Sequence, residues 1–136
     1  MLFTNLVQAN LRTKVLGKQI EYYTRLESTN SEAWELINIG CANGTIIITD
    51  NQFLGKGRGR SIWTSSPNKS LTFSIVLSLD INSKLSNWIS IISSLAIEKA
   101  LTSFSTKVEL KYPNDIMIGQ KKLGGILCET KVSEKK

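Results

Sequence analysis

Two tight turns in the second half of the chain constrain its fold more than any other feature. The first contains Pro113 and Asn114, the second contains Gly119 and Gln120, and short runs of strand-forming residues flank both. Proline presets φ for a turn, and asparagine and glycine adopt the backbone conformations that turns require. Strands that such short connections join run antiparallel. These turns therefore argue against a purely parallel, doubly wound sheet.

Strand and helix patterns alternate along the rest of the chain. Residues 45–49 are β-branched throughout, which is typical of a central strand. A capping-box pattern at residues 29–32 predicts the start of a helix that ends at Gly40. Residues 85–104 predict a second helix, with an apolar face so wide that we expect it to be largely buried. The predicted fold class is α/β in the α+β sense, with helices packed on a mixed, mostly antiparallel sheet.

The expected elements have the following bounds. Residues 71–79 alternate, so Leu71, Phe73 and Ile75 face the same way. We expect strands at residues 20–26, 45–49, 71–79, 108–111, 115–118 and 121–130, a short helix within residues 1–16, a long polar loop at residues 51–69 and a frayed charged end at residues 131–136.

The composition limits the chemistry that this chain can perform. Its 136 residues contain no histidine, which removes Ser-His-Asp and Cys-His mechanisms and the common zinc sites. The net charge of +6 suits nucleic acid, a membrane surface or anionic small molecules. Phosphoryl and nucleotidyl transfer fit the remaining side chains, because these reactions depend mainly on positioning and charge neutralisation.

No segment predicts an association with a membrane. Residues 1–14 contain no signal-peptide pattern, and no apolar stretch approaches the ~20 residues of a membrane span. Cys41 and Cys128 lack the spacing of metal ligands, so we interpret them as reduced thiols. We therefore expect one cytoplasmic domain over residues 1–136, without a membrane partner.

A glycine-rich basic run occupies residues 55–60 (G-K-G-R-G-R). Glycines let a backbone approach a phosphate, and the cations beside them neutralise its charge. The run does not open a helix and lacks a terminal Gly-Lys-Ser/Thr, so it is neither a Rossmann nor a Walker loop. Two interpretations remain, an anion-binding loop and a solvated basic loop.

Two further segments carry candidate polar groups. In residues 111–115 (K-Y-P-N-D), Asn114 could position a phosphate and Asp115 could coordinate Mg²⁺, although a plain hairpin turn explains the same residues. Lys122 precedes Leu123 and two glycines, so it could reach into a pocket that close backbone approach opens. The alternative for Lys122 is an exposed lysine on an edge strand.

In their order and spacing these segments resemble the biotin protein ligases that modify carboxyl carrier proteins. The resemblance implies a fold like that of class II aminoacyl-tRNA synthetases. It also implies an enzyme that makes biotinyl-5′-adenylate from biotin and ATP with Mg²⁺, and then transfers biotin to a lysine of a carboxyl carrier protein. The residues that carry the resemblance are Ser28-Thr29-Asn30, Gln52, residues 55–63, Ser66-Pro67, residues 68–71, residues 111–115 and residues 122–127.

The resemblance implies a role for each matching residue. Biotin would be bound by Ser28, Thr29, Asn30, Gln52, Gly55 and Gly125. The nucleotide and its phosphates would be contacted by Lys56, Gly57, Arg58, Trp63, Lys111 and Asn114. Asp115 would hold the metal, and Lys122 and Arg58 would be catalytic, with Lys122 at the biotin carboxylate and the α-phosphate.

The resemblance covers residues 20–130, the first part of the family's catalytic domain. We therefore expect a domain truncated on its C-terminal side, which could form a homodimer that covers its open sheet edge. No helix-turn-helix pattern precedes the domain, so specific DNA binding is not expected. Lipoate ligases are related, but the histidine of their ligand loop has no counterpart here.

Two other functions remain open. The chain could be a truncated ligase that keeps the pocket but does not complete catalysis. It could instead be a basic module that binds single-stranded nucleic acid, with Trp63 and Tyr112 stacking on bases and the arginines contacting phosphates.

Overall fold

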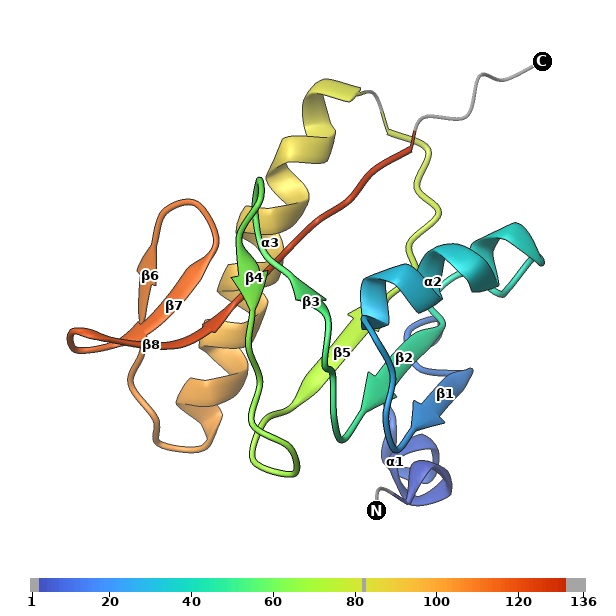
Figure 1. Ribbon diagram of the computed structural model, residues 1–136, viewed down its shortest axis with the longest axis horizontal. Coiled ribbons are helices and arrows are strands. Elements are labelled where there is room, and N and C mark those ends of the chain that lie inside the picture. Colours follow the sequence, from blue (N-terminus) through green and yellow to red (C-terminus); the bar gives the residue numbers. More distant parts are fainter. Residues whose placement is uncertain (1–2, 82, 132–136) are drawn as a thin grey trace. The chain divides into compact units, whose positions relative to one another are not determined.

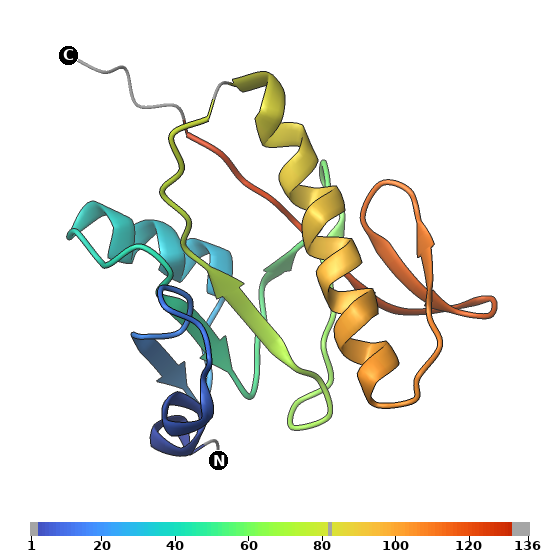
Figure 2. The same ribbon diagram turned by 180° about the vertical axis from the view of Figure 1, so that it is seen from behind.

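The computed structural model describes residues 3–81 and 83–131. The chain divides into two compact units, Met1–Leu79 and Asp80–Lys136. Strands of the described residues form three small sheets, shown from the front in Figure 1 and from behind in Figure 2. One strand pair is parallel and the other described pairs are antiparallel, which confirms the mixed, mostly antiparallel prediction.

The first unit is built on a three-stranded sheet in the order β1-β2-β5. Helix α1 (Thr4–Asn10) precedes β1 (Ile20–Tyr23), and α2 (Thr29–Asn38) connects β1 to the parallel strand β2 (Ile46–Thr49). Strand β5 (Thr72–Ile75) runs antiparallel on the other side of β2. The predictions of a short N-terminal helix and of a central strand at residues 45–49 are therefore confirmed.

Helix α2 contacts β2 and β5 (Figure 1). Its Ala33 packs with Ile47 and Val76, which are 0% and 7% exposed and form the core of this unit. Of the strand predicted at residues 71–79, only Thr72–Ile75 forms, and the apolar residues of the predicted alternation, such as Phe73, are exposed. The intervening Ser74 instead reaches α2. Alternation alone does not reveal which face of a strand a helix will cover.

The start of α2 differs from the prediction by one residue. Ser28, in extended conformation, is the N-cap and its Oγ accepts the N–H of Ser31, whereas Thr29 is already helical. The Thr29 hydroxyl is engaged by Gln52, so it does not cap the helix. The predicted end is confirmed, because Gly40 has φ +86° and its N–H bonds to the carbonyl of Ile37.

The segment predicted as a loop, residues 51–69, contains an antiparallel hairpin. Strand β3 (Gly55–Lys56) pairs with β4 (Ile62–Trp63). Two-residue strands are too short to produce an alternating pattern, which is why the sequence did not predict them. The order of the remaining predicted elements is confirmed.

The second unit contains one long helix and a three-stranded antiparallel sheet. Helix α3 (Ser83–Ser103) contacts β6 (Glu109–Lys111) and β7 (Asp115–Ile118), and β8 (Lys121–Gly125) pairs with β7. Both predicted turns are confirmed, and the Tyr112–Pro113 peptide bond in the first is cis. The charged end predicted at residues 131–136 lies, apart from Lys131, outside the described residues.

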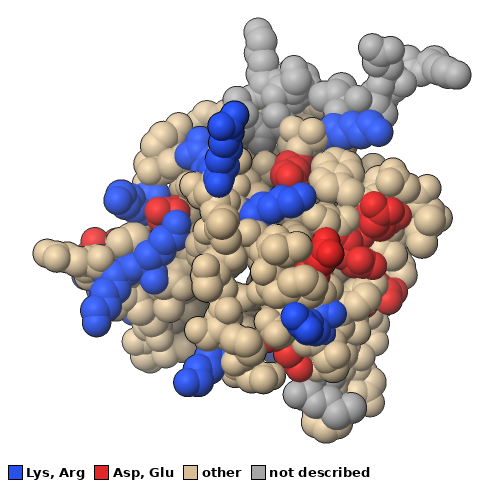
Figure 3. Space-filling model, viewed as in Figure 1, with Lys and Arg blue, Asp and Glu red and all other residues tan. Residues whose placement is uncertain are grey.

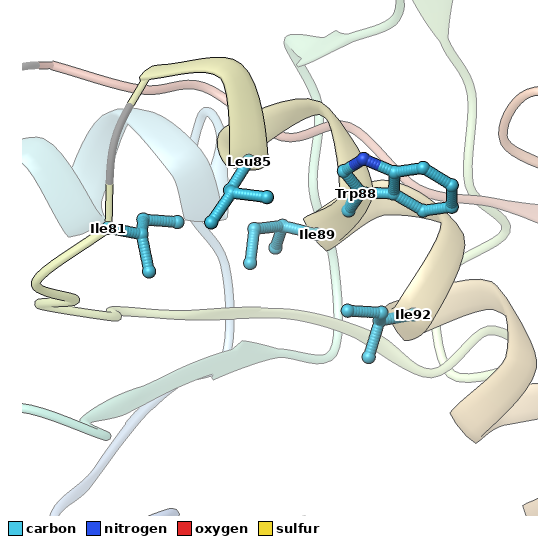
Figure 4. A pocket seen from close by; sticks show the side chains of 5 residues that line it. All are labelled: Ile81, Leu85, Trp88, Ile89 and Ile92. Carbon is cyan, nitrogen blue, oxygen red and sulfur yellow. The ribbon is translucent and has the colours of Figure 1, made fainter.

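The expectation that α3 is largely buried is wrong. Leu85, Trp88 and Ile92 are 48–58% exposed, whereas Ser94 is buried. The contacts of α3 with β6 and β7 therefore leave these apolar side chains uncovered. Ile81 and the helix residues Leu85, Trp88, Ile89 and Ile92 line an apolar hollow of about 330 Å³ (Figure 4). In the described part of the chain, no helix is both long and apolar enough to cross a lipid bilayer.

Candidate functional site

Five polar side chains converge at the N-terminus of α2, and we call Ser28, Thr29, Asn30, Gln52 and Ser74 the polar cluster. The Oε1 of Gln52 accepts the main-chain N–H of Thr29 at 2.8 Å and its hydroxyl at 3.2 Å. The hydroxyl of Ser74 lies 2.8 Å from that of Thr29 and also contacts Oδ1 of Asn30. Ser28, Thr29 and Gln52 are 3%, 4% and 8% exposed. Buried groups bonded in this way are rigidly oriented.

The parallel pair β1–β2 explains why residues far apart in the chain meet here. Leu26 and Gln52 form a parallel bridge just beyond the two strands. The N–H of Leu26 bonds to the carbonyl of Asn51, and the N–H of Phe53 bonds to the carbonyl of Leu26. The carboxyl ends of neighbouring parallel strands are a common place for ligands in α/β sheets. The polar cluster lies at that edge.

Gly55 comes shortly after Gln52 in the chain, and there is no room for a side chain at this position. A Cβ there would lie 2.4 Å from Nε2 of Gln52 and 2.5 Å from the carbonyl oxygen of Trp63. Glycine therefore lets β3 and β4 approach Gln52 closely.

The β3–β4 hairpin carries the basic run. The N–H of Gly57 bonds to the carbonyl of Ser61 at 2.8 Å, and Arg58, Gly59 and Arg60 at the tip are exposed. Lys56 reaches back to α2, where its Nζ donates to Oγ of Ser31 at 3.1 Å. The hairpin thus presents cations to solvent and is joined to the helix beside the polar cluster.

A largely acidic cleft of about 410 Å³ adjoins the N-terminus of α2. Ser28 and Ser31 line it together with three carboxylates and one guanidinium, those of Glu27, Glu32, Glu35 and Arg25. Acidic side chains gather over α2 in the space-filling view (Figure 3). Carboxylates repel phosphates, so this cleft is unsuited to a nucleotide.

Tyr23 anchors α2 to β1 through Glu32. Its hydroxyl donates to Oε1 of Glu32 at 2.7 Å. Burial, as the largest cause, together with the hydrogen bond and charge of Glu32 and the charge of Glu21, raises the pKa of Tyr23 from 10.0 to about 12. Tyr23 therefore stays protonated, and a structural donor, at neutral pH.

The second unit brings together the other predicted residues. Lys122 Nζ lies 2.6 Å from Oδ1 of Asp115. Asn114 Nδ2 donates to the carbonyl of Ile126 at 2.8 Å, and the Ile126 N–H returns a bond to the Asn114 carbonyl at 2.9 Å. Asn114 therefore holds the chain just beyond β8. Lys111 and Gly125 lie opposite Asp115 on the neighbouring strands.

The residues do not fit a resident metal ion. Within residues 3–81 and 83–131, no group of three or more His, Cys, Asp or Glu side chains could hold one. The predicted ligand Asp115 is neutralised by Lys122. The lining of the hollow in Figure 4 offers no metal ligand either, because four of its side chains are aliphatic and the indole N–H of Trp88 can only donate.

The polar cluster contains all the predicted biotin residues of the first unit except Gly55, which abuts it. Ser74 was missed by the sequence analysis. The available signal was its polar side chain on the face of the strand opposite Leu71, Phe73 and Ile75. The hairpin holds Lys56, Gly57, Arg58 and Trp63, whereas Lys111, Asn114, Asp115, Lys122 and Gly125 belong to the second unit.

A family model and individual relatives assign the chain to the same family. A model described as the Biotin/lipoate A/B protein ligase family matches residues 22–136. The bifunctional ligase/repressor BirA of Bacillus subtilis (strain 168) is 30% identical over 129 residues, which cover 94% of this chain and 40% of that protein. The chloroplastic biotin–protein ligase 1 of Arabidopsis thaliana is 33% identical over 100 residues, covering 68% and 27% of the two chains. The chain thus spans less than half the length of these relatives.

Solved structures show the same likeness. The biotin protein ligase of Leishmania major in complex with biotinyl-5-AMP has a TM-score of 0.71 and 25% identity, over 83% of this chain and 52% of that chain. The biotin acetyl coenzyme A carboxylase synthetase of Helicobacter pylori, with bound biotinylated ATP, has a TM-score of 0.70 and 27% identity, over 83% and 55%. The predicted fold resemblance is confirmed, and the chain belongs to the Biotin/lipoate A/B protein ligase family.

Proposed function

We propose that this chain binds biotin and ATP, forms biotinyl-5′-adenylate and transfers biotin to a lysine of a carboxyl carrier protein. The observation that carries the proposal is the polar cluster at the carboxyl edge of β1 and β2, beside a glycine-rich cationic hairpin. Relatives with this fold have been solved with biotinyl-5-AMP and with biotin and ATP.

In this proposal the polar cluster recognises the biotin head. A ureido group offers one acceptor and two donors, and buried hydroxyl and amide groups of fixed orientation match such a pattern. Ser28, Thr29, Asn30 and Gln52 supply these groups, and we assign Gly55 and Gly125 to the same ligand. The bond from Thr29 to Gln52 supports this role because it fixes which way the Gln52 amide points.

The cationic residues act on the phosphates. Attack of a carboxylate on an α-phosphate joins two anions, so preorganised cations lower the barrier. We assign this role to Arg58 and Lys122, with nucleotide contacts from Lys56, Gly57, Trp63, Lys111 and Asn114. Exposed Arg58 on a glycine-rich hairpin supports the role of a closing loop that excludes water from the adenylate.

In this proposal Mg²⁺ binds together with ATP. The ion would be held mainly by the nucleotide's phosphates, which is common for Mg²⁺. Asp115 stays a predicted metal ligand, although no cluster of three or more potential ligands is found among the described residues. No step of the proposed reaction requires Asp115 to bind the ion.

The acceptor lysine and the cellular location complete the proposal. Two relatives bear the name biotin–[acetyl-CoA-carboxylase] ligase, which supports a carrier protein as acceptor. Free Cys41 and Cys128 support a reducing compartment, for which we propose the cytoplasm. A homodimer and the lack of specific DNA binding stay predictions, checked by sedimentation and by a DNA-binding assay.

Isothermal titration with biotin, followed by ATP and Mg²⁺, tests the proposed function. Biotin binding and pyrophosphate release are expected. Biotin binding without pyrophosphate release would identify a binding fragment that does not complete catalysis. Salt-sensitive binding of oligonucleotides without biotin binding would instead assign the exposed arginines to single-stranded nucleic acid.

A further inference from the structure

Two residues with separate predicted roles in the second unit are bonded to each other. Lys122 Nζ lies 2.6 Å from Oδ1 of Asp115, and their side chains are 44% and 25% exposed. We propose that Asp115 is a positioning residue that orients the Lys122 ammonium toward the reacting phosphate, and that it is not the ligand of a resident metal ion. This inference rests on the proposed function, because it names the group that orients a lysine assigned to that reaction.

A bulge in β8 creates the pair. Asp115 lies opposite Gly125, and Ile116 lies opposite Gly124, but Met117 lies opposite Lys122 because the register shifts there. In a regular ladder Lys122 would lie opposite Ile118, on the other face of the sheet from Asp115. One extra residue therefore moves the lysine to the face of Asp115, where the two lie diagonally across neighbouring strands.

Stability alone does not account for this arrangement. A half-exposed ion pair contributes little to the free energy of folding. A lysine, however, has a long flexible stem, and its charge must be held in place if it is to act as a preorganised donor. The carboxylate supplies that restraint, and the bulge makes it possible.

The ion pair also argues against Asp115 as a ligand of a resident Mg²⁺ ion. Oδ1 of Asp115 faces an ammonium, which neutralises the carboxylate. Mg²⁺ demands near-octahedral oxygen coordination, and the described residues place no group of three potential ligands together. A carboxylate that a lysine neutralises attracts Mg²⁺ less than a free one does, so the pair favours the positioning role of Asp115 over the role of a metal ligand.

Acylation of the lysines tests the pair without any activity. The parent chain and its Asp115→Asn and Asp115→Glu variants are treated with an N-hydroxysuccinimide ester of acetate, and modified peptides are quantified by mass spectrometry. Lys121 is the internal control, since it is exposed and lies opposite Ile118, on the other face. In the parent, Lys122 should react about two- to fivefold more slowly than Lys121.

The two variants should change the acylation rate of Lys122 differently. Asp115→Asn should bring the two rates together, whereas Asp115→Glu should keep Lys122 slow. Mg²⁺ alone should leave the parent rates unchanged. Equal rates in the parent would overturn the proposal, as would a rise of the Lys122 rate on adding Mg²⁺, since that rise would mean that the ion displaces the lysine.

Ligand affinity separates positioning from a purely structural role. Asp115→Asn should weaken binding of a non-hydrolysable biotinyl-adenylate analogue by roughly three- to tenfold and leave biotin binding unchanged, and Asp115→Glu should restore most of the loss. Removal of a negative charge near a phosphate would by charge alone tighten binding, so unchanged or tighter binding overturns the positioning role. A parent that binds neither biotin nor the analogue refutes the proposed function, while the acylation rates still decide whether the pair exists.

Discussion

Gln52 is bonded through its side-chain oxygen to both the main-chain N–H and the hydroxyl of Thr29. The two residues are separated by 23 positions in the chain, Thr29 at the start of α2 and Gln52 in the segment that follows β2. A single amide thus joins the N-terminus of α2 to the start of the cationic hairpin. The amide nitrogen of Gln52, Nε2, faces Gly55 so closely that a side chain at residue 55 would clash with it.

Replacement of Gln52 should cost both stability and ligand binding. Gln52→Ala leaves the buried Thr29 groups without their acceptor, which typically costs about 1–3 kcal/mol. The free energy of unfolding in urea is expected to fall by that amount, and biotin affinity should fall with it. Gln120→Ala, at the exposed turn between β7 and β8, is the matched control and should change neither quantity. An unchanged urea midpoint for Gln52→Ala would show that the bond is not formed.

Gly55→Ala should destabilise the first unit through a steric clash. The new Cβ would lie 2.5 Å from the carbonyl oxygen of Trp63, which belongs to the backbone and cannot rotate away. Overpacking of this kind costs about 1–3 kcal/mol. Gly124→Ala is the control, because its Cβ would meet only Ile116 Cδ1 at an ordinary 3.8 Å. Thermal melts of the two variants check the difference, and equal melting temperatures would contradict it.

Local patterns predicted local structure well. The turns at Pro113 and Gly119, the central strand of residues 45–49 and the helix end at Gly40 follow from neighbouring residues, and all are confirmed. The Gln52–Thr29 bond, the Ser74 contact and the Lys122–Asp115 pair depend instead on tertiary contacts and on one bulged residue. No periodicity encodes such contacts, so the sequence could suggest which residues matter but not which atoms meet.

The β3–β4 hairpin should be mobile without ligand. Two ladder positions, one turn and the exposed bond from Lys56 to Ser31 hold it, and its arginine tip is exposed, so few contacts oppose local opening. The amides of Gly57 and Ser61 should exchange with deuterium much faster than those of β2, and biotin with ATP should slow them. Exchange as slow as in β2 before any ligand is added would argue against a closing loop.

Alkaline pH should weaken the attachment of α2 to β1. The pKa of Tyr23 is raised to about 12 in the folded state, against 10.0 for an ordinary tyrosine. The contribution of Tyr23 to stability is therefore complete below pH 10 and is lost as the pH rises from about 10 to about 12, since only the unfolded chain ionises in that range. Urea melts across this range should show the decline, and Tyr23→Phe should flatten it.

The tyrosinate absorbance provides the control for that prediction. The component that titrates near pH 12 should vanish in Tyr23→Phe, whereas Tyr112→Phe should retain it. If the late component is lost in Tyr112→Phe instead, the raised pKa belongs to Tyr112 and the prediction for Tyr23 is wrong.

Lys122 is the residue whose loss should affect chemistry most and stability least. A cation beside the α-phosphate is worth more as charge develops in the transition state than in the ground state. Lys122→Ala should therefore lower pyrophosphate release from biotin and ATP by roughly 10²-fold or more, the scale of a lost preorganised donor. The melt should move little, because both members of the pair are partly exposed and such pairs contribute within about 1 kcal/mol. Lys121→Ala, one residue away on the opposite face, should release pyrophosphate at the parent rate. If the Lys122 and Lys121 variants release it equally fast, Lys122 is not the catalytic cation.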